Sequence, residues 1–331
     1  MTPLARVLTG LVVVALAVAV TVWLARYQPF GPGGPIGTPL PTNAPAARGW
    51  ADAGEAPFAR LEMATAVHDG QFWLAGGFAP DGSVSDALAV FDPTTGEWTD
   101  GPSLPEALHH AALASDGERL YLVGGYLGST GQPTEMVRVL DSAAGEWTEG
   151  PSLPQPRAAG ALAFDGSRFV YAGGVGPGGV RGEVFALDGE AWQRLGDLAR
   201  PREHLAAATD GDGRVWFLGG RQGGLDRNVG DVELVTGDAI DLIASVTPRG
   251  GVAAFFTAFG ACLTGGEAPT GALSIVECVD ADGRVTALPP MTQPRHGHGA
   301  GVVDGVAYAL LGGDQPGLDA TATVETLPLG E

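Results

Sequence analysis

The sequence contains no lysine, so all 18 of its basic residues are arginines. This absence is typical of coding bias in a GC-rich genome and does not by itself indicate guanidinium chemistry. Acidic residues number 38, which gives a formal net charge of −20. A chain this acidic repels the phosphate backbone, so its composition argues against nucleic acid as a partner and favours a soluble acidic surface.

Several motifs that mark common enzyme classes are also missing. There is no glycine-rich phosphate-binding motif, no nucleophile elbow and no carboxylate cluster of the kind that holds paired metals. The sequence therefore predicts no cofactor and no metal. Apolar residues nevertheless make up 45% of the chain, which is too many for a disordered protein and enough for a packed core.

The longest apolar run lies near the N-terminus. Residues 7–24 carry no charge, and eighteen residues at 1.5 Å each span about 27 Å, enough for the hydrocarbon core of a bilayer. We interpret residues 1–27 as a cytoplasmic tip and a transmembrane signal anchor; a cleaved signal peptide is the alternative. Both place the rest of the chain on the extracytoplasmic side. Residues 28–48, rich in proline and glycine, form a linker.

Beyond residue 48 the chain repeats. Six Gly-Gly doublets, each at the end of a short apolar run, recur every 46 to 49 residues. They are Gly76-Gly77, Gly124-Gly125, Gly173-Gly174, Gly219-Gly220, Gly265-Gly266 and Gly312-Gly313. An Asp-Gly pair in the run before most doublets predicts a tight hairpin of type I′, as at Asp69-Gly70, Asp116-Gly117, Asp165-Gly166 and Asp304-Gly305. Each repeat thus predicts a four-stranded antiparallel meander, and a ring of such sheets buries faces that one sheet alone exposes.

These motifs resemble the kelch repeat. The apolar-Gly-Gly doublet is followed by a tryptophan in three repeats (Trp98, Trp147 and Trp192), and Pro-Arg precedes four of the first strands, at Arg157, Arg202, Arg249 and Arg295. The resemblance covers residues 49–331 and implies an all-β, six-bladed kelch-type propeller behind an N-terminal transmembrane helix. Repeat two departs from the pattern, with Ala107 where arginine is expected. Because kelch propellers serve as enzymes, adaptors and scaffolds, the fold leaves the activity open.

The two ends of the propeller are predicted to share a sheet. The last repeat stops after three strands, while residues 49–55, which include Trp50, match an outer strand that has no repeat of its own. We expect this N-terminal strand to close the ring. In the fifth repeat, Cys262 and Cys278 lie on neighbouring antiparallel strands and predict a disulfide; two buried free thiols are the alternative.

Charged residues provide the candidate site. Arg60, Arg157, Arg202, Arg249 and Arg295 each precede an innermost strand, and we expect them around one mouth of the central channel, where they could gather an acidic ligand. The alternative is structural, since in kelch repeats this arginine often ties blades together. All six histidines fall on the same segments; His110 and His298 match a position where kelch repeats commonly carry histidine, and the set is interpreted as lining core or channel.

The loops between second and third strands vary most, and recognition commonly lies on such loops. Tyr126, Arg221, Asp226 and Arg227 are the candidate contacts there. We therefore predict a membrane-tethered extracytoplasmic module that binds a protein or an envelope glycan through this loop face. The alternatives are a sugar-acid enzyme resembling the kelch-type sialic-acid epimerases, with Glu203 and His204 for proton transfer, and a purely structural spacer.

Overall fold

The computed structural model describes residues 49–330. The predicted membrane segment, residues 7–24, and the predicted linker, residues 28–48, lie outside the described residues. Within residues 49–330, no helix is long and apolar enough to cross a membrane. The only helix in that range is the short 3₁₀ turn η1 (Leu225–Arg227); everything else with regular structure is strand.

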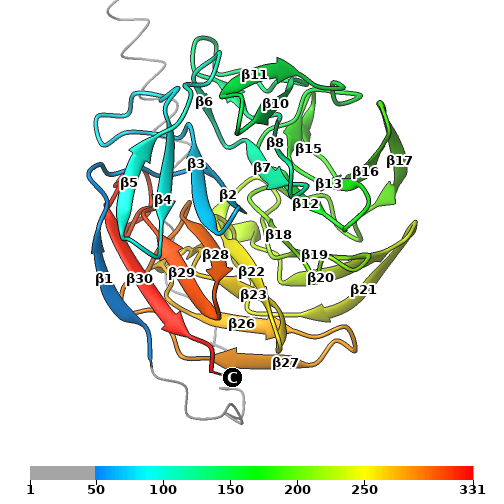
Figure 1. The fold of residues 1–331 in the computed structure, drawn as a ribbon. Helices are drawn as coiled ribbons and strands as arrows, with labels where there is room; N and C mark the ends of the chain where they lie inside the picture. The colour runs from blue at the N-terminus through cyan, green and yellow to red at the C-terminus, as the bar shows by residue number, and fades with distance from the viewer. Residues whose placement is uncertain (1–48, 331) are drawn as a thin grey trace, which may run out of the picture. The chain divides into compact units, whose positions relative to one another are not determined.

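Six four-stranded antiparallel sheets, the blades, surround a common axis, which confirms the all-β six-bladed propeller (Figure 1). From the axis outward, blades one to three contain β2 (Ala64–His68), β3 (Gln71–Ala75), β4 (Leu88–Asp92) and β5 (Glu97–Asp100); β7 (Ala112–Ser115), β8 (Arg119–Val123), β10 (Val137–Asp141) and β11 (Glu146–Glu149); and β12 (Ala161–Phe164), β13 (Phe169–Ala172), β16 (Glu183–Asp188) and β17 (Ala191–Asp197). Blades four to six contain β18 (Ala206–Thr209), β19 (Arg214–Leu218), β20 (Asp231–Thr236) and β21 (Ala239–Ser245); β22 (Ala253–Thr257), β23 (Gly260–Thr264), β26 (Val276–Val279) and β27 (Val285–Leu288); and β28 (Gly299–Val303), β29 (Val306–Leu310), β30 (Thr323–Pro328) and β1 (Ala51–Glu55).

The ring closes at both its inner and its outer edge. Each innermost strand contacts the next one around the axis, and β28 of the last blade contacts β2 of the first. At the outside, β1 pairs antiparallel with β30, with Ala51 opposite Thr326, so the start and the finish of the described chain share one sheet (Figure 1). Trp50, 5% exposed, packs into the apolar layer between the fifth and sixth blades. This pairing is the one expected for residues 49–55.

The Gly-Gly doublets join one blade to the next. Both residues of the first doublet have positive φ, and a Cβ on Gly76 would lie 2.2 Å from the Leu108 carbonyl oxygen of blade two. The second glycine, Gly77, donates its N–H to that same carbonyl at 2.7 Å. Equivalent bonds run from Gly125 to Arg157 and onward around the ring. Glycine is required because the chains approach too closely for a side chain.

The hairpins between first and second strands follow the type I′ expectation only in part. At Asp69-Gly70 and Asp304-Gly305 both residues have positive φ, as this turn requires. At Asp116-Gly117 and Asp165-Gly166 only the glycine does, and the prediction is wrong there. In both cases the connection is longer, and the aspartate side chain accepts hydrogen bonds from backbone N–H groups two and three residues ahead.

Short strands and one covalent bond complete the frame. Two two-stranded ribbons lie within connections between second and third strands: β14 (Val175–Gly176) with β15 (Gly179–Val180), and β24 (Glu267–Ala268) with β25 (Gly271–Ala272). In a third ribbon, β6 (Leu108–His109), which precedes the first strand of blade two, pairs with β9 (Tyr126–Leu127) in the connection after the second strand. In blade five, Cys262 on β23 and Cys278 on β26 are register partners and form a disulfide, which confirms that prediction.

Candidate functional site

A closed ring of backbone hydrogen bonds surrounds the axis of the propeller. One residue just before the first strand of each blade contributes its N–H and its carbonyl. Each N–H donates to the carbonyl of the equivalent residue in the preceding blade, at 2.8 to 3.0 Å, and the last link returns to the first blade. We call these six residues the axial ring: Glu62, His110, Ala159, His204, Gly251 and Gly297.

All six residues of the axial ring have left-handed backbone conformations, with φ between +53° and +65°. Glycine, at positions 251 and 297, adopts this conformation freely, whereas other residues pay about 1–2 kcal/mol for it. Glu62, His110 and His204 keep large polar side chains there regardless. Backbone strain of this kind persists where the surroundings enforce it and is concentrated at functional sites.

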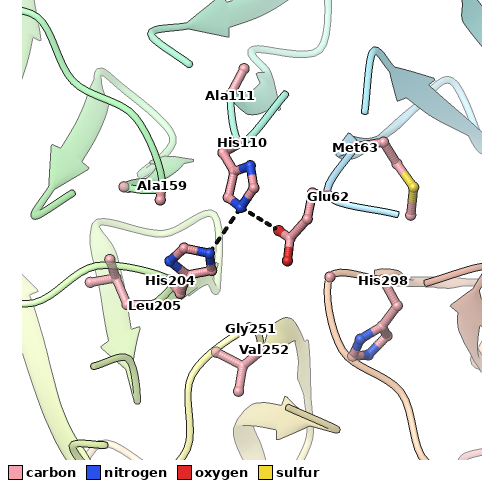
Figure 2. Close-up of a pocket in the computed structure, with 12 residues that line it drawn as sticks. Glu62, Met63, His110, Ala111, Ala159, His204, Leu205, Gly251, Val252 and His298 are labelled. Carbon is pink, nitrogen blue, oxygen red and sulfur yellow. Dashed lines mark hydrogen bonds and ion pairs between the residues drawn. The ribbon is translucent and has the colours of Figure 1, made fainter. Parts of the chain in front are cut away.

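The three polar side chains of the axial ring meet. The Nε2 atom of His110 lies 2.9 Å from Nε2 of His204 and 3.3 Å from Oε2 of Glu62. Figure 2 shows His110 between the other two, with all three directed toward the same point. The three side chains offer ligand atoms that all lie within 4.8 Å of one another. We call them the axial triad.

Three buried charged residues, Glu203, Arg221 and Glu267, lie behind the triad. Nδ1 of His204 contacts a carboxylate oxygen of Glu203. The other oxygen of Glu203 accepts a hydrogen bond from Nε of Arg221 at 2.9 Å, and Arg221 also pairs with Glu267. Arg221, Glu203 and Glu267 are buried. The result is a charged layer directly beneath the triad.

Two further histidines flank this layer. Nδ1 of His109 lies 2.6 Å from Nδ1 of His110, and the His109 ring stacks between Phe78 and Tyr126, with centroids 4.2 and 5.1 Å away. His296 brings Nδ1 to 3.7 Å from Oε1 of Glu62. Its Nε2 lies 2.8 Å from the backbone oxygen of Gln315. Aromatic packing and the contact with His110 therefore fix the ring of His109, and the hydrogen bond to the backbone fixes the ring of His296.

Burial and neighbouring charges set the protonation of the cluster. Burial lowers the pKa of His110, and burial together with Arg221 holds the pKa of His204 well below its ordinary value. Burial alone would raise the pKa of Glu62, but His110, His296 and His204 outweigh it and hold that pKa well below the usual range. At neutral pH the triad is therefore two neutral imidazoles and one carboxylate.

The pKa of His296 moves the other way. Burial would lower the pKa of its ring, but Glu62 and Glu267 overcome that effect and raise it. His109 faces no carboxylate as close, so burial and the neighbouring His110 lower its pKa to about 4. The carboxylates therefore favour the protonated form of the His296 ring, whereas burial favours the neutral form of the other rings in the cluster.

A cavity of about 100 Å³ opens on the axis at this level. Every blade lends it two consecutive residues, the axial-ring residue and the one after it (Figure 2). Glycine and alanine occupy the axial ring in the other three blades, which leaves room for the cavity beside the triad. A Cβ on Gly297 would come within 2.6 Å of the Glu62 carboxylate, which shows that this glycine makes room for it.

The five arginines predicted to line the mouth do not border this cavity. Four of them are fully buried, and each pairs with a glutamate on the third strand of its own blade. The pairs are Arg157 with Glu183, Arg202 with Glu233, Arg249 with Glu277, and Arg295 with Glu325. Arg60 donates to the carbonyl of Gly76 at 3.2 Å. This placement matches the structural alternative in kind, but the side chains tie strands of their own blade, whereas the expectation was that they tie neighbouring blades together.

The other predicted contacts divide into two groups. Glu203, His204, Arg221 and Tyr126 all belong to the cluster or stack against it. Asp226 and Arg227 lie on η1, where both side chains are exposed to solvent. The structure therefore assembles four of these six residues around the axis.

Glu62 was missed by the sequence-based prediction, and so was the equivalence of His110 with His204. In repeat two, Leu108 stands at the position that arginine occupies in the other repeats. Its carbonyl accepts a hydrogen bond from a glycine of the preceding doublet, as the arginine carbonyls do elsewhere. The assignment of this position to Ala107 is therefore wrong by one residue. The grouping of His110 with His298 is wrong for the same reason. With this register, the residue two places after each arginine position is an axial-ring residue, a signal the sequence does contain.

Comparison with known proteins agrees with this architecture. A family model described as the Kelch motif matches residues 59–105 and 107–154, which are the first two repeats. No curated protein matches the chain. The matched segments end before His204, Arg221 and Glu267, so the family match carries no information on the charged layer.

Proposed function

The chain is a kelch-repeat β-propeller, and from this premise we propose that it is a binding module that engages a protein partner through one face of the ring. Kelch propellers generally mediate protein interactions, so the fold favours a role as scaffold or adaptor. We define the loop face as the six connections between second and third strands. In each meander these connections lie at the same end as the start of the innermost strand.

The observation that carries the proposal is the kelch-repeat propeller itself, and its loop face has one large apolar side chain exposed to solvent. Leu318, in the connection between β29 and β30, is 46% exposed. It lies next to the connection of blade one, where a Cβ on Gly82 would be 3.8 Å from its Cδ1. Exposed aspartates, Asp81 and Asp319, flank it. Leu318 is thus the point on the loop face at which contact with a partner is best tested.

The sugar-acid enzyme is less well supported. It depends on guanidiniums that are free to hold a carboxylate, but four of the five arginines are buried in pairs with glutamate. The axial cavity of about 100 Å³ is also well below the roughly 300–1,000 Å³ of typical small-molecule sites. Binding of an acidic sugar at the loop face stays an outcome of the test below.

The test is site-specific photocrosslinking with the full chain in its own membranes. A photoreactive residue replaces Leu318 in one variant and Leu242 in a matched control, because Leu242 is the other large exposed apolar residue of the described chain, on outer strand β21. We expect one protein to be captured at position 318 and not at 242. Equal capture at both positions, or capture of glycan alone at 318, would contradict the protein-binding proposal.

We further propose that residues 7–24 tether the propeller on the extracytoplasmic side of the cell membrane. The supporting observation is the Cys262–Cys278 disulfide, since such bonds persist mainly in oxidising compartments. The test is protease accessibility in intact cells and in inverted vesicles. Degradation of the propeller from the cytoplasmic side only, or recovery of the full chain in the soluble fraction, would refute the tether.

A further inference from the structure

The axial triad has the composition of a metal site. Two imidazole nitrogens and one carboxylate oxygen form a ligand set used by three-ligand zinc sites, which leave a further coordination position open. Tetrahedral coordination at about 2.0–2.1 Å places ligand atoms about 3.3 Å apart. The separations from His110 Nε2 are 2.9 Å to His204 and 3.3 Å to Glu62. Only a slight outward shift of His204 is needed to admit an ion.

The orientation of the rings is fixed as a metal ligand requires. A histidine that coordinates through Nε2 usually holds a carboxylate or another polar group at Nδ1, which fixes the tautomer and aims the ring. His204 has Glu203 at that position, and Arg221 holds Glu203 in turn. His110 has His109 at 2.6 Å. Both Nε2 atoms therefore point toward the axis and toward Glu62 (Figure 2).

The charges around the triad leave room for a cation. Glu62, Glu203 and Glu267 bring three carboxylates to this part of the axis, and the guanidinium of Arg221 contacts two of them. His296 lies 3.7 Å from Glu62 and 4.0 Å from Glu267. Even with His296 protonated, carboxylates exceed cationic groups by one. The surroundings of the triad therefore attract a positive ion instead of repelling it.

The backbone adds an independent observation. Glu62, His110 and His204 occupy left-handed positions at which the other three blades have glycine or alanine. A hydrogen-bonded core histidine would gain nothing from a strained backbone position that glycine fills without cost. Three ligands held at matched positions of a closed ring, by contrast, gain a fixed geometry around one point.

We propose that Glu62, His110 and His204 bind one divalent first-row transition ion, zinc foremost, on the axis of the propeller. The open coordination position faces the axial cavity, which is large enough for a few water molecules or for one side chain of a partner. The site lies at the same end of the ring as the loop face. Metal binding goes beyond the proposed partner binding and stands without it.

The test uses the full chain in detergent, purified without a polyhistidine tag and stripped by a chelator. Bound zinc is counted by mass spectrometry after equilibrium dialysis, and cobalt is added separately as a spectroscopic probe of coordination. The variants are His110→Ala, His204→Ala and Glu62→Gln. Alanine is tolerated at this backbone position, since Ala159 occupies it in blade three. The matched control is His68→Ala, a buried histidine bonded to Ser115 and Ser142 away from the triad.

The expected result is one zinc per chain for the natural sequence and for His68→Ala, with a zinc-dependent rise in melting temperature. Each triad variant should weaken binding by at least about 100-fold and abolish the visible bands of bound cobalt, because loss of a direct ligand costs more than the 10–100-fold typical of second-shell changes. Glu62→Gln keeps the shape of the side chain and separates loss of a ligand from loss of fold. Failure of the natural sequence to bind any first-row ion, or stoichiometric uptake by the His110→Ala/His204→Ala double variant, would overturn the proposal.

Discussion

The arginine–glutamate pairs and the axial ring each recur at one fixed position of the blades. The two positions differ in how far their residue types vary from blade to blade. The pairs repeat the same chemistry in four blades, with the arginine buried in every pair and the glutamate buried in all but Glu183. The axial ring changes from blade to blade, from glutamate through histidine to alanine and glycine. A position with the same residues in every blade stabilises the fold in the same way each time. A position where only some blades have strained polar residues indicates a function beyond stability.

The difference also appears in what each group contacts. The guanidinium of Arg202 donates to Glu233 at 2.9 Å and to the Gly219 carbonyl, so it joins the first, second and third strands of one blade. The axial triad joins side chains from three different blades across the channel. Pairs act within a blade, and the triad acts between blades.

Breaking one repeated pair should have the largest effect. Glu233→Ala leaves the Arg202 guanidinium buried without its partner, and removal of one member of a buried ion pair costs about 3–5 kcal/mol. Denaturant unfolding of the full chain measures this loss. The double variant Arg202→Met/Glu233→Leu should recover most of it, because no buried charge remains. A loss below about 1 kcal/mol in the single variant would mean that the pairs do not hold the fold.

Acidification should separate the buried histidines from the repeated pairs. Burial, with Arg295 and His296 nearby, lowers the pKa of His298 to about 3, whereas an unfolded histidine has a pKa of about 6.5. Below pH 6.5 the unfolded state binds a proton that the folded state does not, so stability falls as the pH falls. The slope is about 1.4 kcal/mol per pH unit, or about 2 kcal/mol between pH 7 and pH 5.

Replacing this histidine tests the assignment. His298→Asn should flatten the acid loss by about that 2 kcal/mol, because asparagine does not titrate in this range. Unfolding free energies at pH 7 and pH 5, both in the presence of chelator, provide the comparison. An unchanged difference between the two pH values would show that His298 is not the group responsible.

Gly297→Ala tests whether the ring makes room for the triad. The new Cβ would lie 2.6 Å from Oε1 of Glu62, and φ is +54°, so we expect a loss of about 1–2 kcal/mol and weaker zinc binding. Gly251→Ala is the matched control, since its φ is +65° but its nearest contact is 3.3 Å from His296 Cβ. Both should lose stability, and only Gly297→Ala should lose zinc affinity. Equal zinc binding by the two variants would contradict the role of Gly297.

The fold could be predicted because its signals are local and repeated. Gly76-Gly77 and its five counterparts mark the same backbone approach in every blade, and the cysteines are separated by one connection between adjacent strands. The axial triad depends instead on register between repeats that are far apart in the chain. An assignment wrong by one residue at Leu108 was enough to hide the equivalence of His110 and His204. Glu62 had no signal of its own, because glutamate appears at this position in one blade alone.

The partners of the arginines were hidden for a different reason. Each of the four paired arginines precedes a first strand, and its glutamate lies on the third strand, 26 to 31 residues later. The sequence contains this spacing, but a spacing that varies with loop length is visible only once the strands are aligned. Their placement inside the blades therefore had to come from the structure.

The smallest effect belongs to the strained backbone itself. His204→Gly removes a side chain from a residue with φ +54°. The strain it relieves, about 1–2 kcal/mol, exceeds the stability lost through the greater freedom of glycine in the unfolded chain, so the free energy of unfolding should rise by up to about 1 kcal/mol. Ala159→Gly, at the same φ in blade three, is the control without a polar side chain. If both variants gain stability and only His204→Gly loses zinc, the strain at His204 is held for the site. A loss of stability at His204→Gly without a loss at Ala159→Gly would instead make the histidine a structural residue, and the triad would join the arginine pairs as part of the frame.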